Sequence, residues 1–273
     1  YNYNPPKTPG ASFVEGDKSD LSWSANFAAI YKLTKTTDLT FNIARSFRAP
    51  ALEERFQYID LGGVIYLGNP NLDPEDGYYF DLGTRFWLDN FTFKLNLFAN
   101  FVNNYIVDNP VVTDSLYVKN NVSKARIYGF DLSFEYEFIK SFVFYGNASY
   151  TRGKDTEMDL DLPEIPPLNG KLGLRTNYLN YISADLTANI YDNQTDGKIN
   201  VDPKKWQVHT PGYVTYDLFL NSMPIDVKLA KLTISAGIEN ITNKAYRNSL
   251  STNRGIIKLE PGRNYFAKIS LNW

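Results

Sequence analysis

The carboxyl-terminal stretch 263–273 alternates between apolar and polar side chains. From Tyr265 onward every second residue is apolar, and from Lys268 onward the residues between them are polar. A period of two predicts a strand with one apolar face and one polar face. Because the same alternation recurs elsewhere, the sequence predicts an all-β fold. Three of the other alternating stretches are 92–101, 182–190 and 232–239.

The strand-like segments are long, and their connections follow a regular pattern. About eleven segments are expected, most of roughly 10 residues or more, which is the length that a tilted strand needs to cross a bilayer. Short turns and long loops alternate between them, as in an outer-membrane barrel. The chain is therefore predicted to be a segment of an antiparallel, up-and-down transmembrane β-barrel, with short periplasmic turns and long extracellular loops. The segments are 21–33, 36–46, 77–88, 91–107, 117–138, 142–152, 169–178, 181–191, 212–222, 231–240 and 263–273.

The composition agrees with a barrel wall. Aromatic residues make up 15% of the chain, with 20 Tyr and 18 Phe, yet the mean hydropathy is −0.35. A wall with an apolar lipid face and a polar lumen face has this combination. No segment approaches the length of apolar sequence that a transmembrane helix needs. The absence of cysteine excludes disulfides and thiol chemistry, and a net charge of −2 gives no reason to expect a nucleic-acid partner.

The odd number of expected strands is itself informative. A closed bacterial barrel made from one chain has an even number of strands. An open sheet would expose two unpaired edges to lipid, which is not tolerated. Either the count is one strand off or the chain is a piece of a larger barrel. Its first residues do not form a signal peptide, so we expect that a signal has been removed or that the sequence begins inside a longer one.

Three motif clusters lie in or beside the expected long loops. They are 45–54, 68–75, and 237–246 together with 261–265. Proline residues in these clusters end strands and stiffen loops. Their arginines are expected to place positive charge in the lumen or at its rim, with glutamates as ion-pair partners. The arginines are Arg45, Arg48 and Arg263, and the glutamates are Glu53, Glu54 and Glu75.

These clusters resemble the carboxyl-terminal half of TonB-dependent outer-membrane receptors. In that family a strand ends in Phe-Arg-Ala-Pro, a loop carries Asn-Pro-x-Leu-x-Pro-Glu, and a later strand starts with an aromatic-Gly-hydrophobic-acidic segment. A Glu-Asn-Leu segment, a Pro-Gly-Arg segment and an aromatic terminus follow. Ile241 and Trp273 here replace the usual Leu and the commoner Phe. The matching residues are Phe47, Arg48, Ala49, Pro50, Asn69, Pro70, Asn71, Leu72, 128–131, Glu239, Asn240, Pro261, Gly262 and Arg263.

The resemblance implies a barrel of about 22 strands closed by an amino-terminal plug. Residues 1–273 would form the carboxyl-terminal half of that barrel, whereas the plug, the TonB box and the first half of the wall would lie outside this sequence. Such receptors lie among the lipids of the Gram-negative outer membrane. The terminal strand resembles the signal that the barrel-assembly machinery reads. The residues of this assembly signal would be Tyr265, Ile269, Leu271 and Trp273.

The resemblance also implies active import of a scarce metal chelate. The ligand would be captured in the extracellular loops, and the TonB complex would then pull on the plug. We expect a ferric siderophore, with haem or cobalamin as alternatives within the family. We expect no catalytic residue, no resident metal and no cofactor in this part of the protein.

Candidate ligand-binding residues lie in the loops. In haem-type members of the family a histidine near the first two motifs ligates iron, but the only histidine here is His209, in a distant polar loop. Tyr58 and Tyr66 lie in the matching loop and are candidate haem ligands. We favour packing at the rim for both tyrosines, a solvated position for His209, and a structural ion pair over anion capture for Arg48.

Other classes of protein were weighed against the receptor. The acidic segment 155–161 has oxygen ligands for Ca²⁺ but lacks the spacing and glycine of a dedicated site, so a solvated loop is favoured. A hydrolase needs a nucleophile and a base, and one histidine without a flanking nucleophile motif argues against it. A passive porin-like wall and a soluble glycan-binding sandwich remain alternatives. The sandwich would leave large apolar patches in water.

Overall fold

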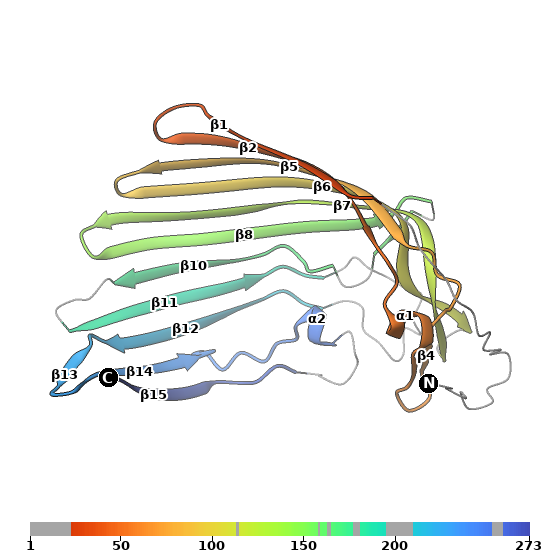
Figure 1. Ribbon diagram of the computed structural model, residues 1–273. Coiled ribbons are helices and arrows are strands. Elements are labelled where there is room, and N and C mark those ends of the chain that lie inside the picture. Colours follow the sequence, from red (N-terminus) through yellow and green to blue (C-terminus); the bar gives the residue numbers. More distant parts are fainter. Residues whose placement is uncertain are drawn as a thin grey trace.

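The long strands form one curved sheet (Figure 1). The structure is a computed structural model that describes residues 23–112, 115–157, 159–162, 165–176, 181–194, 210–252 and 259–273. Within these ranges each long strand pairs antiparallel with the next long strand in the chain. The long strands are β1 (Ala25–Lys32), β2 (Thr37–Arg48), β5 (Glu75–Leu88), β6 (Phe91–Val112), β7 (Leu116–Ile139), β8 (Phe142–Asp155), β10 (Asn169–Thr176), β11 (Ile182–Tyr191), β12 (Tyr213–Ser222), β14 (Ala230–Glu239) and β15 (Asn264–Asn272).

Each expected strand corresponds to one of these elements, so the up-and-down topology is confirmed. Short turns join the strands at one end of the sheet and long segments join them at the other. We call these the short-turn end and the long-loop end. In the described part of the chain, no helix is long and apolar enough to cross a membrane.

The strand register separates the side chains onto two faces. One face is apolar and convex, and its side chains are largely exposed; Leu97, for example, is 46% exposed. The other face is polar and hollow. One row across neighbouring strands on the apolar face is Phe41, Leu82, Leu97, Phe130 and Tyr150. The adjacent row on the hollow face is Thr40, Gly83, Asn96, Asp131, Ser149 and Asn169.

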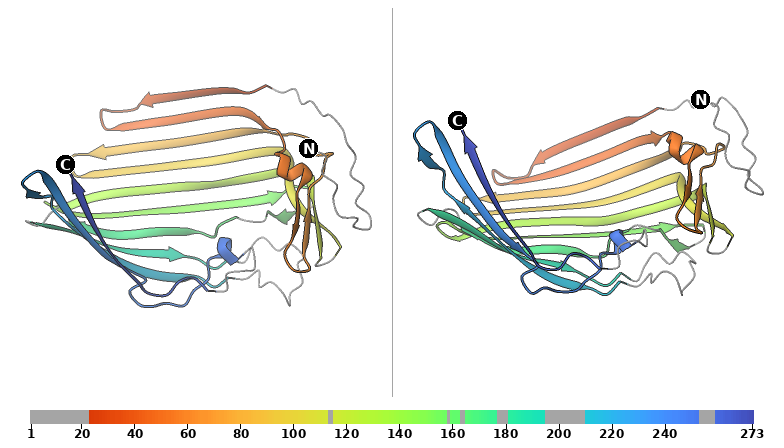
Figure 2. Two further views of the ribbon diagram at one scale, coloured as in Figure 1. Left: turned by 60° about the horizontal axis from the view of Figure 1, so that its bottom comes forward. Right: turned by 90° about the horizontal axis from the view of Figure 1, so that it is seen from below.

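The sheet is open. Figure 2 shows its curvature and its two edges, formed by β1 and β15. Within the described residues each of these strands has a partner on one side alone. The backbone groups on the outer side of both strands therefore need another partner before the sheet can lie in a bilayer. This geometry fits a piece of a larger wall.

The long-loop end is more ordered than the sequence predicted. The expected irregular segment 47–76 contains α1 (Leu52–Phe56), β3 (Tyr58–Asp60) and β4 (Ile65–Leu67). The prediction of a loop near 108–116 was wrong, because β6 and β7 continue through most of this segment. Strand β4 adds to β7 in parallel, with Ile65 opposite Leu116. We call the part formed by α1, β3, β4 and the outer ends of β6 and β7 the outer lobe.

Three smaller elements complete the fold. Strand β9 (Leu160–Asp161) pairs with β8, and β13 (Ile225–Val227) pairs with β14 at the short-turn end. A short helix, α2 (Ser249–Thr252), lies in the segment before β15.

The apolar core is small because a single curved layer has little to pack against. Its buried cluster of Val102, Ala125 and Leu162 lies near the long-loop end.

The two faces predict opposite responses to a lysine at adjacent positions of β6. In the complete protein reconstituted in lipid vesicles, we expect Leu97→Lys to reduce stability by about 2–4 kcal/mol, because it places a charge in the apolar layer. In the matched control Asn96→Lys, the new lysine side chain lies on the hollow face beside Asp81 and Asp131. This variant should therefore be tolerated. Urea unfolding midpoints measure both effects. Equal losses from the two variants would contradict the assignment of the faces.

Candidate functional site

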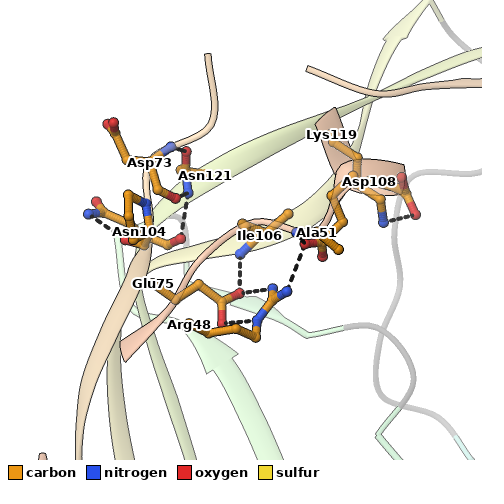
Figure 3. A network of polar contacts seen from close by, with 11 residues as sticks. Arg48, Ala51, Asp73, Glu75, Asn104, Ile106, Asp108, Lys119 and Asn121 are labelled. Carbon is orange, nitrogen blue, oxygen red and sulfur yellow. Dashed lines mark hydrogen bonds and ion pairs between the residues drawn. The ribbon is translucent and has the colours of Figure 1, made fainter. Parts of the chain in front are cut away.

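An ion-pair cluster joins the wall to the outer lobe (Figure 3). Arg48 ends β2 and Glu75 begins β5, and the register places them directly opposite each other. Arg48 Nε donates to Glu75 Oε2 at 2.8 Å, and Nη2 donates to Oε1 at 2.6 Å. This is the two-pronged geometry in which a guanidinium binds a carboxylate most strongly. We call the cluster built around this pair the Arg48 clamp.

The clamp also holds the start of α1. Arg48 Nη1 donates to Glu54 Oε2 at 2.7 Å, and the backbone N–H of Ala51 donates to the same oxygen at 2.8 Å. Glu54 lies in the first turn of α1, where it can accept a free backbone N–H. The Phe-Arg-Ala-Pro motif therefore places its arginine between the strand pair and the helix.

A third connection reaches β6. Glu75 is only 8% exposed, and its Oε1 also accepts the backbone N–H of Ile106 at 2.9 Å. Both carboxylate oxygens thus have charged or backbone donors, which is what a buried carboxylate requires. Of the expected glutamate partners, Glu75 and Glu54 bind Arg48, whereas Glu53 contributes its backbone carbonyl to the end of α1.

Asparagine side chains connect the Asn-Pro-Asn-Leu motif to the β6–β7 hairpin through hydrogen bonds. Asn69 Oδ1 accepts the N–H of Asn71 at 2.9 Å in a local turn, and Asn69 Nδ2 donates to Asn120 Oδ1 at 3.1 Å. Asn121 binds both backbone groups of Asp73, through Oδ1 at 2.9 Å and Nδ2 at 3.0 Å. Leu72 is fully buried between these contacts. The motif is thus an anchor of the outer lobe.

The electrostatics of Glu54 follow from the clamp. Burial of its carboxyl alone favours the neutral form and raises the pKa. The hydrogen bonds from Arg48 and from the Ala51 N–H favour the ionised form and outweigh burial. The pKa of Glu54 is therefore lower than its ordinary value, and the carboxylate is ionised at neutral pH.

The candidate haem ligands lie in different settings. Tyr66, in β4, stacks on Tyr117 with ring centroids 4.9 Å apart. Tyr58 lies half-buried in β3, opposite Leu67. His209 lies outside the described residues. The structure brings the two tyrosines into one hairpin, and their role in ligand binding stays a hypothesis.

The carboxyl-terminal motifs form a second anchor at the long-loop end. Asn240 is buried; its N–H donates to Asp217 Oδ1 at 2.8 Å, and its side chain binds both backbone groups of Lys244. Glu239 accepts Asn264 Nδ2 at 3.0 Å. The described residues show no glutamate paired with Arg263, contrary to expectation; its Nη1 donates to Tyr265 at 3.3 Å instead.

Arg45, the third arginine of the motif clusters, and the acidic segment 155–161 also form ion pairs. Arg45 was expected at the lumen or its rim, but the register places it on the apolar face, where it pairs with Asp76 at 3.4 Å and lies 4.2 Å over the ring of Trp23. In the acidic segment, Asp159 pairs with Lys154 at 2.7 Å. Among the described residues, no group of three or more His, Asp or Glu side chains is arranged to hold a metal ion.

A groove of about 600 Å³ lies on the hollow face of the wall. No single segment of the sequence indicates this groove, because its lining residues are far apart in the chain and come together only in the sheet. The signal was present only as polar residues at alternate positions of each strand. Lining residues that carry charge or an amide include Arg85, Lys94, Asn96, Asp131, Asn147 and Lys171.

A curved, up-and-down antiparallel sheet with an apolar outer face, a polar hollow face and all its long connections at one end is the wall of a transmembrane β-barrel. The chain belongs to the TonB-dependent receptor family. A family model described as "TonB dependent receptor-like, beta-barrel" matches residues 1–241. This is a family of receptors and transporters of the Gram-negative outer membrane, not of enzymes.

Known proteins agree with this assignment. The chain is 25% identical to the Heme/hemopexin utilization protein C of Haemophilus influenzae (strain 86-028NP), over 88% of this chain and 36% of that protein. It is also 25% identical to the Ferric enterobactin receptor PirA of Pseudomonas aeruginosa, over 97% of this chain and 39% of that protein. The chain therefore spans little more than a third of the length of these relatives.

Solved structures share the fold. The Copper transporter OprC matches with a TM-score of 0.76 at 22% identity, over 90% of this chain and 39% of that chain. A mutant of the ferric enterobactin receptor PfeA of Pseudomonas aeruginosa, in complex with enterobactin, matches with a TM-score of 0.70 at 19% identity, over 92% and 40% of the two chains.

The clamp predicts a local effect of removing its arginine. In the complete receptor, Arg48→Gln leaves the buried Glu75 without its charged partner, so we expect the opening of segment 49–74 to become easier by about 1–3 kcal/mol. Hydrogen exchange at the amide of Ala51, which donates to Glu54 in the clamp, measures the change. Arg45→Gln is the matched control, since it removes an arginine of the same strand that lies outside the clamp. Equal protection of this amide from exchange in the two variants would contradict the role of Arg48 in holding the outer lobe.

The lowered pKa of Glu54 predicts how the clamp responds to acid. A carboxyl whose pKa is lower in the folded state contributes stability above its unfolded pKa and loses it as the pH falls through the folded value. Exchange in segment 49–74, corrected for its intrinsic pH dependence, should be unchanged between about pH 7 and pH 5 and should increase only below about pH 4. Opening already between pH 7 and pH 5 would be inconsistent with this ion pair.

Proposed function

We propose that this chain is the carboxyl-terminal half of the barrel of a receptor that imports a metal chelate, and that the chelate is a ferric siderophore. The outer lobe is the observation that carries the proposal. Ligand capture needs a surface that is shaped before the ligand arrives, and the Arg48 clamp together with Asn69 and Asn121 fixes such a surface at the long-loop end.

The family and the open edges support the domain organisation. Residues 1–273 supply one arc of wall, and the other arc and the plug are proposed to come from the rest of the polypeptide. The relatives are long enough for this, because the chain covers only 36–39% of them. Captured ligand would pass through the lumen when the TonB complex pulls on the plug.

The apolar face is proposed to contact outer-membrane lipid, and the last strand to carry the assembly signal. The register of β15 with β14 places Tyr265, Ile269 and Leu271 on the apolar face. Trp273 follows at the short-turn end and is 95% exposed. A strand with this pattern and an aromatic end is what we propose the barrel-assembly machinery reads.

The names of the relatives bear on the ligand without deciding it. Enterobactin is a siderophore, and the chain resembles receptors named for it by sequence and by fold. Other relatives are named for haem and hemopexin. The stacking of Tyr66 on Tyr117 supports a packing role for that ring, so we place the siderophore first.

Uptake by the complete receptor tests the proposal. Cells that lack their own siderophore receptors should accumulate ⁵⁵Fe from ferric enterobactin or another ferric siderophore when they produce this receptor. The same cells without TonB should not. Growth on haemin alone would favour the haem alternative. Passage of small solutes that does not need TonB would replace the receptor with a passive pore.

A further inference from the structure

Four basic side chains gather on the apolar face of the wall, at the long-loop end of β7 and β8. They continue the alternation that places Phe130 on this face, at every second residue of each strand. Lys154 lies directly opposite Arg126. Side chains that are opposite or diagonal on adjacent strands lie within about 5–8 Å of one another, so one headgroup can reach several of them. We call Lys124, Arg126, Arg152 and Lys154 the outer basic patch.

The patch begins where the apolar layer of the wall ends. On β7 the apolar face runs from Phe138, near the short-turn end, to Tyr128. About ten residues of strand span about 33 Å, which at a tilt of about 40° gives a height of about 25 Å, the height of the lipid-facing band of such barrels. Tyr128 and Tyr150 end this band, and tyrosine is typical of the membrane interface. The next outward side chains, Arg126 and Arg152, therefore lie at the level of the lipid headgroups.

The position of the patch does not depend on the rest of the barrel. Strands β7 and β8 lie between β6 and β10, away from both edges of the sheet, and the patch is on the convex face (Figure 2). A plug lies on the hollow side and a further arc joins the edges, so these side chains still point outward in a complete receptor. On β6 the same two rows carry Phe101 and Asn103 in place of cations. The positive charge is thus a local feature of β7 and β8.

The two strands differ in how their cations are neutralised. The cations of β8 pair with acids in and beside β9, Arg152 with Asp161 at 3.2 Å and Lys154 with Asp159 at 2.7 Å. Lys124 and Arg126 of β7 are exposed, and the described residues provide neither with an ion pair. Arg126 also faces the like charge of Lys154, an arrangement that costs stability. An anion bound here offsets this repulsion.

We propose that the outer basic patch binds the phosphate groups of a lipid in the outer leaflet. Lys124 and Arg126 contact the phosphate, and the planar guanidinium of Arg126 can bind two of its oxygens at once. The acyl chains lie on the adjoining apolar face, over Tyr128 and Phe130. A lipid is the occupant because cations and apolar surface adjoin here, whereas a soluble anion uses the cations alone.

The inference rests on the proposed orientation, with the apolar face in lipid and the long loops outside. It is independent of which ligand the receptor imports, because the patch points away from the lumen. It adds a lipid-binding site on the outer wall to the proposed function.

Lipid binding to the purified complete receptor tests the site. The probe is lipid A with two phosphate groups, compared with the same lipid after dephosphorylation, and native mass spectrometry measures how much of each lipid stays bound. We expect the double variant Lys124→Gln and Arg126→Gln to bind lipid A about thirtyfold more weakly, as the loss of two basic residues at an anionic lipid surface predicts. Dephosphorylated lipid A should bind both proteins equally weakly.

The matched control removes two cations from the other face. Lys94 and Lys171 are exposed on the hollow face, so Lys94→Gln combined with Lys171→Gln should bind lipid A like the wild type. An equal loss in this control would show a general effect of net charge and would overturn the site.

Three further results decide the inference. Equal affinity of the wild-type receptor for the two forms of lipid A would overturn it, and this comparison needs no variant. Binding of inorganic phosphate as tight as that of lipid A would indicate a site for a free anion and would overturn the lipid. A receptor that binds lipid A as expected but accumulates no ⁵⁵Fe from any ferric chelate would support the patch and count against the proposed import function.

Discussion

The structure depends on the requirement that peptide groups inside a bilayer find hydrogen-bond partners in the protein. A sheet meets this requirement only where each strand has a neighbour on both sides. Within the described residues the long strands from β2 to β14 have such neighbours, whereas β1 and β15 do not. The length of the strands, their two-faced side chains and the need for a further arc of wall all follow from this one constraint.

The wall and the outer lobe are stabilised in different ways. The wall is a single layer, so its side chains turn to the apolar face or to the hollow face, and its buried core is small. The outer lobe projects from the end of the wall and is held mainly by polar contacts. A buried carboxylate, Glu75, accepts hydrogen bonds from Arg48 and from the backbone of β6, and Arg48 in turn binds Glu54 of α1. Because such a cluster is strong only when all its members are in place, it can give the lobe one defined shape.

The sequence could predict the wall because its signal is local. Alternation within a strand and turn residues at its ends depend on neighbouring residues, and the expected strands were confirmed. The outer lobe could not be predicted in this way. The segment 108–116 contains polar residues and Pro110, which favour a loop, but most of it belongs to β6 and β7. Strand β7 is also paired there with β4, from which it is separated by about fifty positions of the chain. The partners of Asn69 and Asp73 are equally remote, so Asn120 and Asn121 gave no signal.

The candidate site was predicted in part. The pairing of Arg48 with Glu54 and Glu75 could be expected from opposite charges in adjacent motifs. The partner of Arg263 could not, because it is the neutral hydroxyl of Tyr265, which a search for opposite charges does not indicate. The groove could not be predicted, because it exists only after the seven strands that line it are placed in register. A row such as Lys94, Ser133, Asn147 and Lys171 has no trace in any single segment.

The central claim is that this chain is an arc of membrane wall with lipid on one face and a lumen on the other. The chain has no cysteine, and once any cysteine in the rest of the receptor is replaced, single cysteines can be placed along β11 and spin-labelled in the complete receptor in lipid vesicles. Oxygen, which concentrates in lipid, should collide most with labels at the apolar positions, and collisions should fall at each position between them. Uniform accessibility, or a maximum at the polar positions, would contradict the account. The apolar positions are Ile182, Ala184, Leu186, Ala188 and Ile190, and the polar ones are Ser183, Asp185, Thr187 and Asn189.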